Sequence, residues 1–245
     1  MILNKHKVNT LEFLMNKNKT FLAIIPARGG SKRLPRKNVL ELCGKPLIAW
    51  SIEAGLKSKY IDKLIVTSDD EDILSISEKY GSDIIKRPEE LSNDTATTFD
   101  ALKHTIDNLE KYDYIVLLQP TSPLRNEKYL DEAIELLEQK NADAVISVCE
   151  MDHSPLWSNT LPEDGCMKSF LKEEVLNKRS QDLDKYFRLN GAIYVCKIDK
   201  FLENKGFFLK ENIYAYKMDK KNSIDIDDEF DFLMTEYIIN YKNTK

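Results

Sequence analysis

The sequence predicts an α/β fold built on a doubly wound, mostly parallel sheet. Three observations carry this prediction. Residues 21–27 (FLAIIPA) form a continuous apolar run, which is typical of a strand buried on both faces of a parallel sheet. Similar short runs recur along the chain. Segments with helical periodicity separate them, and this alternation indicates parallel strands joined by crossover helices.

The elements follow in chain order. Six short runs are predicted as strands: residues 21–27, 63–68, 82–86, 114–118, 144–148 and 192–195. Five helices are predicted from apolar residues at helical spacing: one opened by residues 44–46, one running from residue 70 to about residue 80, one over residues 95–111, one around residues 130–137 and one from about residue 228. Together they make one domain over residues 21–245.

Two stretches differ from this rhythm. Residues 1–20 carry four lysines, and Glu12 interrupts their one apolar stretch. We therefore expect an N-terminal extension without a secretory signal, and a cytoplasmic protein. Residues 151–187 are polar, contain Pro155 and Pro162, and show no strong period. They are expected to form a small lobe rather than a core element.

Composition limits the possible functions. The 245 residues carry 36 Lys and Arg against 41 Asp and Glu, a net charge of −5. No window approaches the roughly 18 consecutive apolar residues that indicate a membrane span. A net acidic chain without a basic stripe argues against nucleic-acid binding, which depends on neutralising phosphates. The four cysteines lack CxxC spacing and the three histidines are scattered, so we expect buried, reduced thiols and no zinc site.

A basic loop follows the first predicted strand. Residues 28–37 contain five cations and no anion. Gly29-Gly30 lets the backbone approach an anion closely, while arginine and lysine supply charge for phosphate oxygens. The loop is neither a Walker A sequence nor GxGxxG. Phosphate binding is the favoured interpretation, and a glycine turn with a solvated basic face is the alternative.

An acidic motif lies near the other end of the chain, where residues 225–231 contain five acids. In the extended segment Ser223-Ile224-Asp225-Ile226-Asp227, the two aspartates project to one face. Paired carboxylates can hold Mg²⁺, which typically takes one or two carboxylates together with substrate phosphates. Capping of the last helix by Asp227 is the alternative, and both roles can hold at once. A phosphate loop with a metal pair suggests phosphoryl or nucleotidyl transfer.

Six segments then occur in a recognisable order: IPARGGSKRLPRKN (25–38), GKPLI (44–48), RPEELSNDTATT (87–98), LLQPTSPLR (117–125), FRLNGAIYV (187–195) and SIDID (223–227). Together they resemble the acylneuraminate cytidylyltransferases, the CMP-sialic-acid synthetases and their relatives for bacterial nonulosonic acids. The resemblance spans residues 21–235. It implies a Rossmann-like nucleotidyltransferase fold and an enzyme that joins CTP to a nine-carbon 2-keto sugar acid, with release of pyrophosphate and Mg²⁺ as cofactor.

The resemblance also implies roles for individual residues. Arg28, Lys37 and Asp227 would be catalytic, and Asp225 and Asp227 would bind the metal. The nucleotide would be held by Arg28, Gly29, Gly30, Ser31, Lys32, Lys37, Asn38, Arg87 and Thr98. The sugar would be held by Gln119, Thr121, Ser122, Arg179, Arg188, Asn190, Phe207 and Phe208. Simpler interpretations remain open: core packing for the Phe pair, an ion pair for Arg188, and a strand end at Gln119.

In the family that the sequence resembles, the irregular lobe forms a homodimer and lends a basic residue to the partner's site. Arg179 is the candidate for that residue. The family often has a second arginine where this chain has Ser180, which puts the contact across the dimer in question.

Two other functions are compatible with parts of the sequence. A CMP-KDO synthetase would share the reaction type but usually continues as LPxKPL after the lysine, whereas this chain has Asn38 there. A catalytically inactive nucleotide-binding protein of the same fold would be favoured if Lys37, Gln119 or the Asp pair were replaced by other residues. All of them are present in this chain.

Overall fold

The computed structural model describes residues 19–93 and 95–244, apart from the side chain of Asn243. Of the extension predicted for residues 1–20, residues 1–18 therefore lie outside the described part of the chain. At its end, Lys19 forms an ion pair with Glu138, at 2.7 Å, and the Thr20 backbone N–H donates to Asp113.

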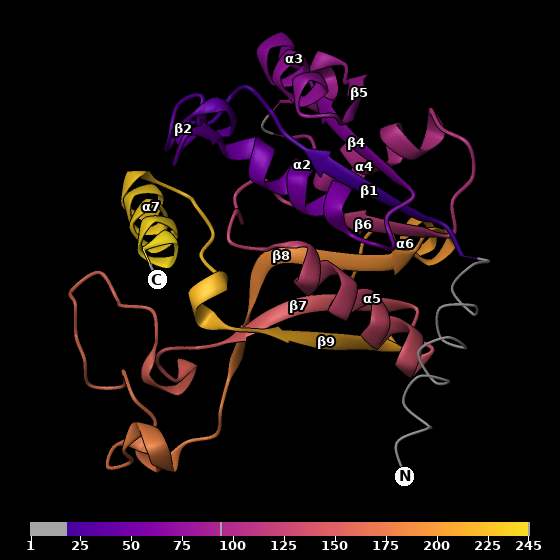
Figure 1. The fold of residues 1–245 in the computed structure, drawn as a ribbon. Helices are drawn as coiled ribbons and strands as arrows, with labels where there is room; N and C mark the ends of the chain where they lie inside the picture. Colours follow the sequence, from indigo (N-terminus) through magenta and orange to yellow (C-terminus); the bar gives the residue numbers. More distant parts are fainter. Residues whose placement is uncertain (1–18, 94, 245) are drawn as a thin grey trace.

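The described residues form one seven-stranded sheet in the order β5-β4-β1-β6-β8-β7-β9 (Figure 1). Its strands are β1 (Phe21–Pro26), β4 (Lys63–Ser68), β5 (Asp83–Lys86), β6 (Tyr114–Leu117), β7 (Ala144–Glu150), β8 (Phe187–Lys197) and β9 (Ile213–Met218). The central β1 pairs in parallel with β4 and β6, and β7 pairs in parallel with β9. β8 runs antiparallel between β6 and β7. The sheet is therefore mostly parallel, as predicted.

Helices cover both faces of the sheet. Side chains of β1 alternate between the two faces, so they pack into two separate cores. Its odd-numbered residues pack with α2 (Leu47–Lys57), α3 (Glu71–Lys79) and α5 (Glu127–Lys140). Its even-numbered residues pack with α4 (Thr98–Asp107) and α6 (Ile198–Asn204). The last helix, α7 (Glu229–Asn243), packs through a third cluster onto Leu47 and the hairpin of β2 (Glu41–Leu42) and β3 (Lys45–Pro46).

All six predicted strands are present, but the sequence did not reveal the short β2–β3 hairpin, β9 or α6. β9 is an edge strand with mostly exposed or half-buried residues, so it lacks the apolar run of a central strand. β8 begins at Phe187, five residues before the predicted start at residue 192. Its first three residues are exposed, so the apolar pattern did not predict this part of the strand.

The lobe between β7 and β8 contains no helix longer than a 3-10 turn within residues 151–186, all of which the structure describes. Its three turns are η4 (Pro155–Trp157), η5 (Glu173–Val175) and η6 (Ser180–Asp182). It leaves large apolar side chains exposed: Leu161, Met167 and Leu176.

Two points bear on the environment of the protein. Cys149 and Cys196 are buried free thiols, as expected, whereas Cys166 in the lobe is exposed and Cys43 is half-buried. Among the described residues, no helix has the length and apolar character that crossing a membrane requires.

Candidate active site

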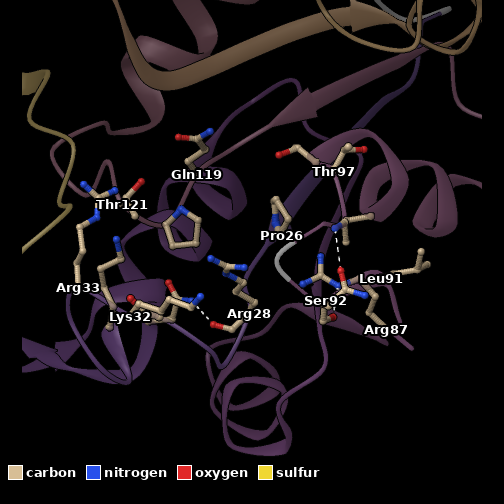
Figure 2. Close-up of a pocket in the computed structure, with 18 of the residues that line it drawn as sticks. Pro26, Arg28, Lys32, Arg33, Arg87, Leu91, Ser92, Thr97, Gln119 and Thr121 are labelled. Atoms are coloured by element: carbon tan, nitrogen blue, oxygen red, sulfur yellow. Dashed lines mark hydrogen bonds between the residues drawn. The ribbon is translucent and has the colours of Figure 1, made fainter. Parts of the chain in front are cut away.

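A cavity of 640 Å³ opens where the central parallel strands end (Figure 2). Its walls come from the basic loop (residues 28–38) after β1, from Arg87 after β5, from Gln119–Thr121 after β6 and from the start of α4. Ligands of open α/β sheets bind at this edge, beyond the carboxyl ends of the strands. The cavity therefore lies where the fold favours a ligand, and it is lined by predicted nucleotide residues: Arg28, Ser31, Lys32, Lys37, Asn38, Arg87 and Thr98.

Neighbouring segments hold the basic loop in place. Asn38 Nδ2 donates to the Arg28 carbonyl, at 3.0 Å, so this residue supports the loop from within. The Gly29 N–H donates to Asp69, and a Cβ on Gly29 would lie 2.6 Å from Asp70 Oδ2. A side chain at this position would therefore have to displace the Asp70 carboxylate, which pairs with Arg36.

The five cations of the loop separate into different roles. Arg28, Lys32, Arg33 and Lys37 line the cavity. Arg36 does not line it and is paired with Asp70 and Asp72 at the start of α3. It therefore anchors the loop to the fold, and the cationic wall is made by the other four.

The acidic loop (residues 223–227) meets the basic loop at Lys37. Lys37 Nζ donates to the Ile226 carbonyl at 2.6 Å, and Arg33 pairs with Asp227 at 2.8 Å. Burial lowers the pKa of Lys37, while Asp227 and Asp225 oppose this shift. Burial raises the pKa of Asp225, and the nearby Asp227 raises it further. The two aspartates therefore share one region with a half-buried lysine.

This arrangement fits a hard divalent cation. Asp225 Oδ1 is buried and has no hydrogen-bond partner among the described residues, so it is a lone acceptor beside a second carboxylate. The described ranges contain no cluster of three or more His, Cys, Asp and Glu side chains that could hold a metal. A pair of carboxylates suits Mg²⁺, which completes its oxygen ligands with water and substrate phosphates.

The cap of α7 differs from the alternative that the sequence left open for Asp227. Asp228, not Asp227, is the N-cap residue, and its side chain accepts from the Asp231 N–H. Asp231 in turn accepts from the N–H groups of Asp227 and Asp228. The carboxylate of Asp227 is thus not used by the helix.

Arg87 and Thr98 also line the cavity, and Figure 2 shows Arg87 on the opposite side from Arg33. Arg87 is buried, and its Nε donates to Ser92 Oγ at 2.8 Å. Burial lowers its pKa, and Asp69 opposes this shift. Thr98 is the first residue of α4, which Thr97 caps through a capping box. Thr97 and Ser92 also line the cavity and were not singled out from the sequence.

The predicted sugar residues are only partly brought together. Gln119 and Thr121 line the cavity, whereas Ser122 and Asn190 are buried. Arg188 donates to the backbone carbonyls of Leu189 and Ser223.

The remaining predicted sugar residues lie elsewhere. Phe207 is in the core against Tyr194 and Phe201, whereas the side chain of Phe208 is exposed. Arg179 lies in the lobe, paired with Asp182, and does not line the cavity.

Two further residues lie near the site: Tyr194, which the sequence did not single out, and Arg125, which the resemblance implies as a support of the sugar site. Tyr194 packs on Phe207, and its pKa is raised by burial and, to a smaller extent, by the charge of Asp225. Arg125 is fully buried and donates to the carbonyls of Ala192 and Gln119, so it joins β8 to the end of β6.

Comparisons with known proteins agree with this geometry. The protein family described as "Cytidylyltransferase" matches residues 22–240. The chain belongs to this cytidylyltransferase family. A pseudaminic acid cytidylyltransferase of Campylobacter jejuni is 34% identical, over 91% of this chain and 98% of the relative. A CMP-N,N'-diacetyllegionaminic acid synthase of Legionella pneumophila is also 34% identical, over 89% and 95%.

Other relatives are longer. An N-acylneuraminate cytidylyltransferase of Escherichia coli is 38% identical over 91% of this chain, but the match covers 52% of that protein. The chain thus spans about half the length of the curated N-acylneuraminate cytidylyltransferases that it matches.

Solved structures share the fold of this cytidylyltransferase-family chain. One is a CMP:2-keto-3-deoxy-manno-octonic acid synthetase complexed with CTP, with a TM-score of 0.68, 17% identity, and coverage of 91% of this chain and 100% of that one. Another is a 4-diphosphocytidyl-2C-methyl-D-erythritol synthase of Anaerococcus prevotii, with a TM-score of 0.63, 17% identity, and coverage of 93% and 99%.

The raised pKa of Asp225 predicts a pH-dependent gain in stability for the variant Asp225→Asn. A carboxyl group whose pKa is raised by folding destabilises the fold once it ionises, so removing the charge should raise the melting temperature of the metal-free protein near neutral pH. The gain should grow as the pH rises through the folded-state pKa and vanish below about pH 4. Thermal melts of both proteins in EDTA, from acid to neutral pH, test this. Equal melting temperatures throughout would contradict it.

Proposed function

We propose that this protein is a cytidylyltransferase that activates a nonulosonic acid with CTP, giving the CMP-sugar and pyrophosphate. The observation that carries the proposal is the meeting of the basic loop with the Asp225–Asp227 pair at one end of the cavity, through Lys37. The names of the Campylobacter, Legionella and E. coli relatives support the nonulosonic acid as substrate class. The KDO synthetase is a structural neighbour at 17% identity, so it supports the fold alone.

In the proposed reaction the anomeric hydroxyl oxygen of the sugar acid attacks the α-phosphorus of CTP. One oxygen–phosphorus bond forms, the bond from the α-phosphorus to the bridging oxygen breaks, and pyrophosphate leaves with its electron pair. The hydroxyl proton passes to solvent. Arg28, Lys32 and Lys37 would bind the triphosphate oxygens and offset the charge that develops on the leaving group.

The other proposed roles rest on the cavity lining and on the resemblance. Arg87 and Thr98 would face the cytidine, and Gln119 and Thr121 would face the sugar. All four line the cavity, and Figure 2 shows Arg87 apart from Gln119 and Thr121. Asp225 and Asp227 would hold Mg²⁺, which when bound supplies positive charge at the phosphate oxygens.

The reaction can be assayed directly. The protein is incubated with CTP, Mg²⁺ and, separately, N-acetylneuraminic, legionaminic, pseudaminic and KDO acids, and pyrophosphate is measured. We expect release with at least one nonulosonic acid and little with KDO. Release with KDO alone would favour the eight-carbon acid. CTP binding by calorimetry without release from any acid would favour an inactive nucleotide-binding protein.

The metal assignment predicts that turnover depends on Asp227 but not on its neighbour Asp228. Asp227→Asn should lower turnover by about 100-fold or more, because a charge that acts in the transition state is lost. Its melting temperature should stay within a few degrees of the wild type, because Asp228 and Asp231 make the helix cap. Asp228→Asn is the matched control and should retain both turnover and stability, since asparagine caps as well as aspartate does. Wild-type turnover in Asp227→Asn would overturn the metal assignment.

We further propose that the protein is a cytoplasmic homodimer joined through the lobe. The exposed Leu161, Met167 and Leu176 of the lobe support an interface there, and the free thiols suit a reducing compartment. Arg179 would then reach the partner's cavity.

Light scattering can test the interface. Leu176→Glu should convert the dimer to a monomer, whereas Leu233→Glu on α7 should not, although Leu233 is similarly exposed, at 54% against 57%. A dimer that survives Leu176→Glu and is lost in Leu233→Glu would place the interface on α7 instead.

A further inference from the structure

Asn190 occupies the centre of a buried hydrogen-bond network, although its motif predicts a contact to the sugar. It is 1% exposed and so has almost no surface to offer a ligand. Its Nδ2 donates to Ser223 Oγ at 2.9 Å and to Met218 Sδ. Its Oδ1 accepts from Ser147 Oγ at 2.6 Å and from the Ala192 N–H. Both ends of the amide are therefore used inside the protein.

This network begins at an irregularity in the sheet. The pairing of β7 with β8 shifts register between Ile146 and Val148, so Ser147 faces the bulged part of β8. Ser147 Oγ accepts from the Ile193 N–H at 2.8 Å while donating to Asn190. The bulge thus turns the Asn190 side chain inward, and bulges often serve to re-aim a side chain in this way.

The network ends at the acidic loop. Ser223 is its first residue, is fully buried, and receives the Asn190 hydrogen bond while donating to the Asp219 carbonyl at 2.8 Å. Two residues later comes Asp225. On its other side the loop is held where the Ile226 N–H donates to the Thr121 carbonyl at 2.8 Å.

Gly191, beside Asn190, leaves the space that Asp225 and Gln119 need. Its φ is +74°, and a Cβ there would lie 2.8 Å from Gln119 Oε1 and 3.4 Å from Asp225 Oδ2. A side chain at this turn of β8 would therefore displace Gln119 and press on Asp225.

We propose that Asn190 is a positioning residue for the acidic loop, acting through Ser223, and does not contact the sugar. The proposal rests on the proposed function, in which that loop holds Mg²⁺. The residues that orient metal ligands are often as important as the ligands themselves, and their loss typically costs about 10- to 100-fold in metal affinity or activity.

The test measures binding without turnover. Calorimetry with CTP alone, in Mg²⁺ and in EDTA, gives the factor by which the metal tightens CTP binding. Asn190→Ala and Ser223→Ala should each reduce this factor by about 10-fold. Neither should change the metal-free affinity for CTP. The double variant should lose little more than either single one, because the two residues act through one hydrogen bond. Ser77→Ala, which removes a buried hydrogen bond in α3, is the matched control and should keep the factor.

Kinetics separate this role from a sugar contact. At saturating Mg²⁺, the KM of Asn190→Ala for the acid should equal that of the wild type. In a separate Mg²⁺ titration, the kcat of Asn190→Ala should rise toward the wild-type value as the Mg²⁺ concentration increases. Gly191→Ala should both raise the KM for the acid and weaken the effect of the metal, since its Cβ meets Gln119 and Asp225. If Asn190→Ala does not fold, Ser223→Ala decides the question alone.

The outcomes are distinct. A raised KM for the acid with an intact metal effect in Asn190→Ala would show a sugar contact and overturn the proposal. A metal effect that persists in both Asn190→Ala and Ser223→Ala would also overturn it while leaving the proposed function in place. A wild-type protein that gains no CTP affinity from Mg²⁺ would overturn both.

Discussion

The hydrogen bond from Lys37 to the Ile226 carbonyl joins two loops that lie 189 residues apart in the chain. Each loop carries charge that is unfavourable in isolation. Burial lowers the pKa of Lys37 and raises that of Asp225, and the opposite charge of each partner offsets part of that cost. The two loops therefore stabilise each other and hold opposite charges beside the cavity. Such preorganised charge is an effective way to stabilise a transition state.

Much of this architecture was predictable because it rests on patterns within short segments. The apolar run of β1 is buried on both faces of the sheet, and the basic loop begins where that strand ends. The roles within the loop were not predictable in the same way. Arg36 and Lys37 are adjacent cations in the sequence, yet a left-handed backbone at Arg36, with a φ of 59°, turns the chain there. One side chain then pairs with α3 and the other faces the acidic loop.

The remaining differences come from tertiary contacts that a linear pattern does not contain. Asp227 and Asp228 are equally good N-cap residues by type, and the backbone of the acidic loop decides in favour of Asp228. Asn190 is part of a motif that predicts a sugar contact, but a register shift between β7 and β8 buries it. Edge strand β9 lacks an apolar run because one of its sides has no neighbouring strand among the described residues.

Arg125 is a buried cation that joins segments behind the site. Its guanidinium is fully buried and forms no ion pair within the described residues, and burial lowers its pKa to about 9. An apolar side chain would be easier to bury. It would, however, leave the Ala192 carbonyl without its donor, and an unpaired buried carbonyl is costly. The Gln119 carbonyl would lose one of its donors and keep those from Ser51 Oγ and the Ser122 N–H. A planar group with five N–H donors can reach α2, β8 and the end of β6 together, since it also donates to Ser51 Oγ. Part of the desolvation cost is thus offset, although Nη1 has no hydrogen-bond partner among the described residues. In return, the segment after β6 and the bulge of β8, which carry Gln119 and Gly191, are held in one arrangement.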